Sequence, residues 1–163
     1  MRRPLLLAVA LLLVLLTSGC SVPPAAVSGV GLDENGELVG YVYVCRHHID
    51  GMALYAADGD VHGSWGAVEP VTGLATWSLS GPSAGWRVET RLTDLDPQRE
   101  YTLYGGTDDN SWSAKGVTFR LDALASTDPG QVTYWSGEID RRGEVNAVAS
   151  VEEFTRDACD LVD

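Results

Sequence analysis

Basic residues are scarce in this chain of 163 residues, and lysine is nearly absent. Eleven lysine and arginine residues face 23 aspartate and glutamate residues, so the formal net charge is −12, and Lys115 is the single lysine. Binding to nucleic acid depends on positive charge that neutralises phosphates, and this composition therefore excludes nucleic acid as a partner. The same charge would repel anionic surfaces and favours divalent cations or basic proteins.

The chain also lacks an apolar run long enough for a transmembrane helix. Its longest run, residues 5–16, has twelve residues, whereas a helix that spans a bilayer needs about 20. Two arginines precede this run, and small residues follow it before Cys20. Basic residues, a short apolar helix and small residues, in that order, indicate an export signal.

The end of this segment, Thr17-Ser18-Gly19-Cys20, resembles the lipobox of bacterial lipoprotein signal peptides, with Thr17 where the family usually has leucine. The resemblance implies cleavage before Cys20, lipid on that cysteine, and retention at the extracytoplasmic face of the cell membrane. A single acyl chain binds a protein to the membrane only weakly, so the multiple acylation typical of the family would be needed for stable anchoring. We therefore expect a signal peptide at 1–19, a membrane-proximal tether at 20–27 and one domain at 28–163.

Cysteine is rare in the remainder of the chain, where only Cys45 and Cys159 are left to pair. In an exported protein, two such cysteines most simply form a disulfide, and we predict this one. The alternative is a pair of free thiols that hold a metal or a haem, but the chain has no Cys-x-x-Cys spacing. We expect no cofactor.

Long helical periodicity is missing after residue 28, where short β-prone runs alternate with turn residues. Asn35-Gly36, Asp50-Gly51 and Asp58-Gly59 predict tight turns. Residues 61–72 are rich in glycine and predict a loop. Apolar and charged residues alternate over 86–92, which predicts a strand with one buried face.

The C-terminal part continues this pattern and then changes. Residues 117–121 and 131–136 predict two further strands. Ser150 and Glu153 have the spacing of a capping box, which predicts a short terminal helix. The sequence thus predicts an all-β domain of seven or more strands with a short C-terminal helix.

Residues 95–103 carry a second resemblance. A leucine and a proline precede Tyr101, as in fibronectin type III and immunoglobulin-like sandwiches, where a tyrosine bonds back to the backbone of the preceding corner. The resemblance implies an immunoglobulin-like β-sandwich and gives this role to Tyr101. The cysteine pair of true immunoglobulin domains is missing, because Cys159 lies near the C-terminus.

Histidine is scarce, with three residues, which limits the candidate transition-metal sites. His47, His48, Asp50 and His62 could bind zinc or copper, but neighbouring residues of a strand point to opposite faces, so His47 and His48 do not easily share an ion. Asp108 and Asp109 could ligate calcium, although the segment lacks the EF-hand pattern. We interpret both groups as polar turns and predict no metal.

Five tryptophans are many for this length, and exposed indoles can stack on sugars or anchor proteins. Strand parity places Trp77 and Trp86 in the core. Trp65 and Trp112 fall in predicted loops and Trp135 lies beside a tyrosine, so these three are the candidate ligand-binding aromatics. The alternative is that they cap the ends of the sandwich.

No catalytic pattern is present: Ser64 has Gly66 two residues after it, but His62 stands where a nucleophile elbow needs the preceding glycine, and carboxylate pairs arise by chance among 23 acidic residues. We therefore predict a lipid-anchored, non-catalytic binding domain whose ligand is a protein or glycan of the cell envelope. A structural or envelope-assembly lipoprotein without a small ligand is the alternative. An envelope hydrolase ranks third.

Overall fold

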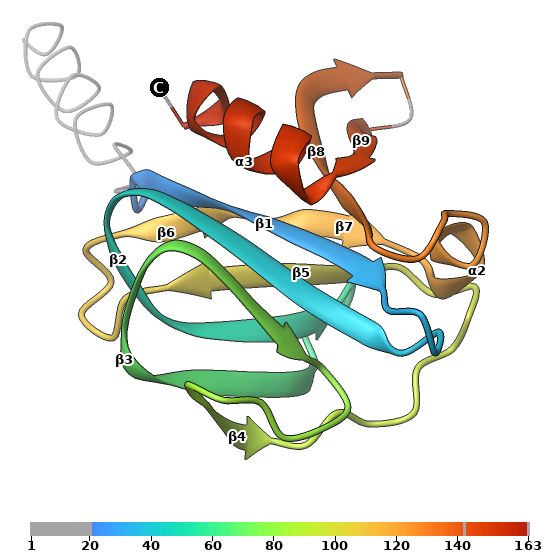
Figure 1. Cartoon of the computed structure of the whole chain (residues 1–163), viewed down its shortest axis with the longest axis horizontal. Helices are drawn as coiled ribbons and strands as arrows, with labels where there is room; N and C mark the ends of the chain where they lie inside the picture. Colours follow the sequence, from blue (N-terminus) through green and yellow to red (C-terminus); the bar gives the residue numbers. More distant parts are fainter. Residues whose placement is uncertain (1–20, 142, 163) are drawn as a thin grey trace, which may run out of the picture.

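The computed structural model describes residues 21–141 and 143–162. The signal peptide and the lipidation of Cys20 lie outside these residues. Within them, no helix is long and apolar enough to cross a membrane. Most of the described chain is in strands, which confirms the all-β prediction, and a short helix follows the last strand (Figure 1).

The described strands are β1 (Pro24–Leu32), β2 (Leu38–Ala56), β3 (Val61–Ser78), β4 (Trp86–Thr90), β5 (Tyr101–Gly106), β6 (Ser113–Lys115), β7 (Val117–Phe119), β8 (Gln131–Asp140) and β9 (Gly143–Ser150). The helices are α2 (Leu121–Leu124), α3 (Val151–Asp157) and the 3₁₀ turn η1 (Ala158–Leu161). β1 begins at Pro24, inside the stretch expected to be a tether.

All the described strands belong to one sheet, in the order β4-β3-β2-β5-β6-β1-β8-β9, with β7 paired to β5. β1 also pairs antiparallel with β2 and parallel with β6, so β1, β2, β5 and β6 form a closed ring (Figure 1). The expected arrangement of two separate sheets is therefore wrong. The four-stranded ring is a small closed barrel, and β3, β4, β8 and β9 extend from it.

Two predicted interruptions of the strands do not occur. The prediction of a turn at Asp50-Gly51 is wrong, because β2 continues through both residues. The strand bends instead at a bulge between Val44 and Ile49, where His47 has φ 60°. The loop over 61–72 is also wrong, because β3 covers it and bends opposite β2. Bulges that bend paired strands are one way for a sheet to turn a corner and close.

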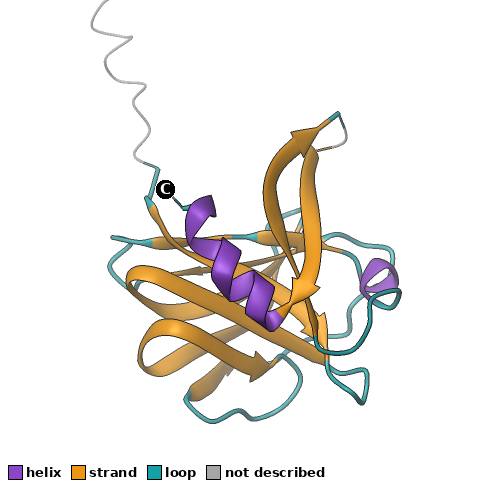
Figure 2. Ribbon diagram, turned by 45° about the horizontal axis from the view of Figure 1, so that its top comes forward, coloured by secondary structure: helices purple, strands orange, loops and turns teal. Residues whose placement is uncertain are grey.

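β1 separates two hydrophobic cores, and its sequence explains how. Ala26 and Val30 face the larger core inside the barrel, whereas Val27 faces a second core beneath α3. Burial on both faces gives a near-continuous apolar strand rather than an alternating one. Figure 2 shows α3 lying across the strands, where Phe154 and Ala158 are fully buried.

Glycines in β1 permit β8 to cross it closely. A Cβ on Gly29 would lie 2.4 Å from Val132 Cγ1, and one on Gly31 would lie 2.2 Å from the carbonyl oxygen of Gln131. Only a residue without a side chain fits such an approach. These two positions therefore determine how β8 enters the sheet.

The C-terminus is fastened to the start of the barrel as predicted. Cys45 and Cys159 form a disulfide with a Cα–Cα distance of 5.5 Å, and the capping box of Ser150 and Glu153 starts α3. Arg46 adds hydrogen bonds, donating from Nη2 to the carbonyl oxygens of Pro24 and Val162 at 3.0 and 2.6 Å. The two ends of the described chain therefore lie together.

Candidate functional site

The structure brings most of the predicted site residues to one corner, where the bulge of β2 meets the loop 107–112. The imidazole of His47 stacks on the indole of Trp112, with ring centroids 3.6 Å apart and planes 10° apart. The Nε2 of His48 lies 3.5 Å from Asp50 Oδ2. The two histidines therefore contact different partners.

The loop 107–112 is held by its own hydrogen bonds. Asp109 Oδ1 accepts from the hydroxyl of Thr107 at 2.8 Å and from the backbone N–H of Ser111 at 2.9 Å. The backbone N–H of Asp108 donates to Asp50 Oδ2 at 3.0 Å, which joins this loop to β2. The loop is therefore held in shape by its own hydrogen bonds, and Asp109 Oδ1 is used for that purpose rather than turned outward as a metal ligand.

Hydrogen bonding explains the acidity of Asp109. The donors of Ser111, followed by the hydroxyl of Thr107, lower the pKa of this carboxyl to about 2. The carboxylate is thus charged at all ordinary pH values, with one of its oxygens occupied by the loop. Among residues 21–141 and 143–162, no three histidine, cysteine, aspartate or glutamate side chains gather as a metal site.

The loop 107–112 forms one end of a shallow groove of about 450 Å³ on the outer face of the barrel. Its floor is made of small residues in cross-strand register: Gly51 lies opposite Gly106 on β5, and Ala53 lies opposite Ser64 on β3. Because these positions carry little or no side chain, the floor leaves space over the sheet.

Two tyrosines and two carboxylates border this groove. Tyr104 lies opposite Ala53 on the neighbouring strand and is 39% exposed, and Tyr55 stands on the same face of β2. Glu89 and Asp108 lie on the rim. Aromatic faces combined with hydroxyl, amide and carboxylate groups suit a ligand that has both hydroxyl groups and flat apolar faces, as sugar rings do.

The three candidate tryptophans have different environments. Trp65 is 1% exposed and lies in β3, so the prediction of a loop aromatic is wrong; its ring is packed in the barrel core with Trp77. Trp112 is half-buried at the corner described above. Trp135 is half-buried in β8, and the ammonium of Lys115 covers its ring at 4.7 Å.

The groove tyrosines were not among the predicted site residues. Tyr104 and Tyr55 occur in ordinary strand patterns, and only the register of β2 against β5 places them around a floor of glycine and alanine. The run Tyr104-Gly105-Gly106 was the available signal, since glycine inside a strand often marks a close approach of backbone or ligand.

Comparison with known proteins supplies no relative. A scan of protein-family models, a search of curated proteins and a search of solved structures each returned no match to this chain.

Proposed function

We propose that this protein is a lipid-anchored, non-catalytic glycan-binding protein at the extracytoplasmic face of the cell membrane. The anchor is Cys20, and the binding surface is the groove between Tyr55 and Tyr104. The observation that carries the proposal is the groove itself, in which small residues leave a floor and tyrosines offer stacking faces.

Export is supported independently of the signal pattern. The Cys45–Cys159 disulfide is the kind of bond that persists outside the reducing cytosol. The acidic rim formed by Glu89 and Asp108 favours neutral or cationic sugars over anionic wall polymers.

Two experiments test the two parts. Detergent-phase partition should retain the wild-type chain and lose the Cys20→Ala variant, and unchanged partition of that variant would refute the anchor.

A glycan array probed with the full chain in lipid nanodiscs should give binding that Tyr104→Ala removes. Val148→Ala is the matched control, because Val148 is 46% exposed on β9, outside the groove.

One observation favours an assembly role with a protein partner as the second candidate. β8 and β9 form a hairpin that projects from the body of the domain (Figure 2), and Ile139 on it is 74% exposed. A projecting hairpin that carries an exposed apolar side chain is accessible to a protein partner. Crosslinking on intact cells that captured only proteins, through Ile139 and not Tyr104, would replace the glycan proposal.

A further inference from the structure

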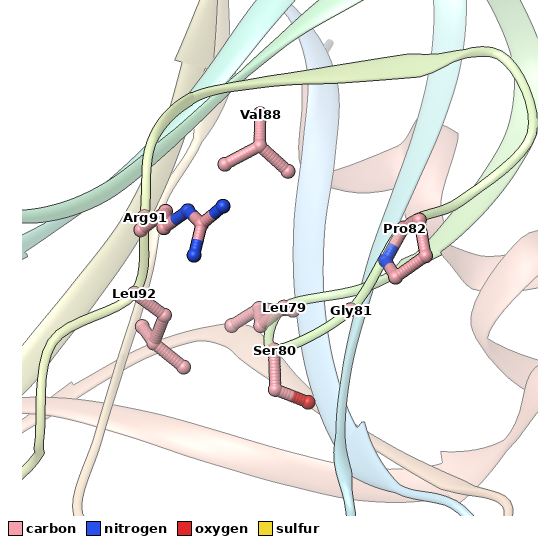
Figure 3. A pocket seen from close by; sticks show the side chains of 7 residues that line it. All are labelled: Leu79, Ser80, Gly81, Pro82, Val88, Arg91 and Leu92. Carbon is pink, nitrogen blue, oxygen red and sulfur yellow. The ribbon is translucent and has the colours of Figure 1, made fainter.

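A second hollow, of about 530 Å³, lies at the far edge of the sheet, between the segment 79–82 that follows β3 and the segment 88–92 of β4 and its continuation (Figure 3). Its walls are largely apolar. Leu79 is 2% exposed at its base, Leu92 packs on the barrel core beside it, and Val88 and Pro82 complete the lining. The volume falls within the range of small-molecule sites, about 300–1,000 Å³.

Edge position explains why this hollow exists. β4 is the last strand in the sheet order and pairs only with β3 in the described part of the chain. Its alternation points Trp86 and Val88 inward, but Trp86 is 8% exposed whereas Val88 is 45% exposed. The apolar face of β4 is therefore covered at one end and left open at the other, where a ligand would gain by burying it.

Arg91 supplies the one charge in this lining. Figure 3 shows its guanidinium extending from the β4 side into the space between Val88 and Leu92, across from Leu79. Within residues 21–141 and 143–162, Arg91 makes no ion pair or hydrogen bond. In a chain with a net charge of −12, an arginine without a carboxylate partner that lines a hollow can hold an anion there.

The neighbouring acids are directed elsewhere. Glu89 lies over Gly66 on the other face of the sheet, since a Cβ on Gly66 would meet Glu89 Oε1 at 2.4 Å. Glu37 accepts a hydrogen bond from the hydroxyl of Ser80 at 3.2 Å. The proton of the Ser80 hydroxyl is therefore donated to Glu37 and is not directed into the pocket. The guanidinium is thus the free polar group of the pocket, and the lining itself contains no carboxylate.

We propose that this pocket binds an apolar monocarboxylate, an acyl chain of about six to ten carbons, with its carboxylate on Arg91 and its chain on Leu79, Val88 and Leu92. One guanidinium offers a planar fork that matches one carboxylate, whereas a phosphate dianion would call for more donors than this lining has. The site is separate from the groove, and β4 lies at the opposite side of the molecule from the start of β1 (Figure 1). The ligand would therefore approach from the side away from the start of β1.

The test is calorimetric titration of the full chain in nanodiscs with hexanoate, with empty nanodiscs as the baseline. Hexanoate should bind with a dissociation constant of about 1 mM or lower, and octanoate about tenfold more tightly, because each buried methylene adds about 0.8 kcal/mol. Hexanamide has the same shape without the charge and should bind at least about fivefold more weakly.

Three variants separate the contributions of charge and shape. Arg91→Gln should weaken hexanoate binding about tenfold and leave hexanamide within about twofold. Arg87→Gln is the matched control, because Arg87 lies in β4, four residues before Arg91 and outside the pocket lining, and it should change the binding of neither ligand. Val88→Trp should fill the hollow and weaken both ligands, and unchanged circular dichroism should show that each variant is folded.

Any of three results would overturn the proposal: no saturable binding of hexanoate at 20-fold the expected constant, equal affinity for hexanoate and hexanamide, or equal losses in Arg91→Gln and Arg87→Gln. None of these results depends on the anchor or on Tyr104. A failure here therefore leaves the proposed glycan groove standing, and the reverse also holds.

Discussion

The imidazole of His47 lies flat against the indole of Trp112, and this contact joins the bulge of β2 to the loop 107–112. His47 has φ 60°, a left-handed backbone conformation that few residues other than glycine adopt, although histidine adopts it more often than most. The stack with Trp112 is therefore one of the contacts that hold the backbone of His47 in this conformation.

Trp112→Ala tests that relationship. Loss of the stacked pair should lower the free energy of unfolding by about 1 kcal/mol, and it should speed hydrogen exchange at the amides of 46–48. Trp135→Ala, which removes an indole from β8 instead, should leave exchange at 46–48 unchanged. Equal exchange in the wild-type protein and Trp112→Ala would show that the bulge holds its conformation without the stack.

Tyr101 fastens the segment before β5. Its hydroxyl accepts a hydrogen bond from the backbone N–H of Asp96 at 2.9 Å, and the side chain is 1% exposed. Tyr101→Phe should therefore destabilise the domain by about 1 kcal/mol in urea unfolding. Tyr104→Phe alters an exposed tyrosine of the same strand and should have no measurable effect, and a similar loss in both variants would contradict this role.

The Cys45–Cys159 disulfide closes a loop with a sequence separation of 114 residues. The chain-entropy model gives about 4–5 kcal/mol for a loop of this length, so reduction should lower the melting temperature by several degrees or more. A Cys45→Ser, Cys159→Ser double variant should melt low and show no response to reductant. Two alkylatable thiols in the non-reduced protein would contradict the pairing.

Asp109 should titrate well below an ordinary aspartate. Its pKa of about 2 lies below the ordinary aspartate value of 3.8, so the loop is supported while the carboxylate is charged and loses that support as pH falls from about 4 through 2. Carboxyl NMR should follow this titration directly. Thr107→Val removes one donor and should raise the pKa of Asp109, whereas Ser126→Ala, outside the loop, should leave it unchanged.

Gly31→Ala should be strongly destabilising, by about 1–3 kcal/mol, because the new methyl group would lie 2.2 Å from a backbone oxygen of β8 that cannot swing aside. Gly81→Ala is the milder comparison, since its nearest neighbour is the hydroxyl of Ser78 at 3.3 Å. Comparable unfolding midpoints for the two variants would show that β1 and β8 separate more easily than this packing implies.

Features with short-range causes were predictable from the sequence. The Asn35-Gly36 and Asp58-Gly59 turns form as expected, with positive φ at both glycines. The capping box needs only residues three apart, and the hydrogen bond of Tyr101 reaches five residues back. In each case the interacting groups are neighbours in the chain, so their types and spacing carry the information.

Closure of the barrel could not be predicted in the same way. β6 has three residues, too few to carry a periodic signal, yet its pairing with β1 completes the ring. The Asp50-Gly51 dipeptide looks like a turn, but long-range pairing with β3 and β5 keeps it extended. The sequence analysis does not predict β6 because its pairing with β1 joins segments that are distant in the sequence. It does not predict β9 either, although β9 pairs with β8, the strand directly before it.

The candidate sites depend on this long-range register. Tyr104 and Ala53 become neighbours only when β5 pairs with β2. Arg91 faces an apolar hollow because β4 ends the sheet, whereas alternation over 86–92 predicts only a strand with one buried face.

The position of β1 has a mechanical consequence. β1 is hydrogen-bonded to β2 on one edge and to β6 and β8 on the other. A force applied at Pro24, against a load held at the opposite side of the domain, would act along the axis of this strand. Force in that direction shears many backbone hydrogen bonds at once instead of peeling them apart singly. Arg46 bonds both Pro24 and Val162, and the disulfide lies next to it, so tension that reached β1 would also be shared with the C-terminal segment.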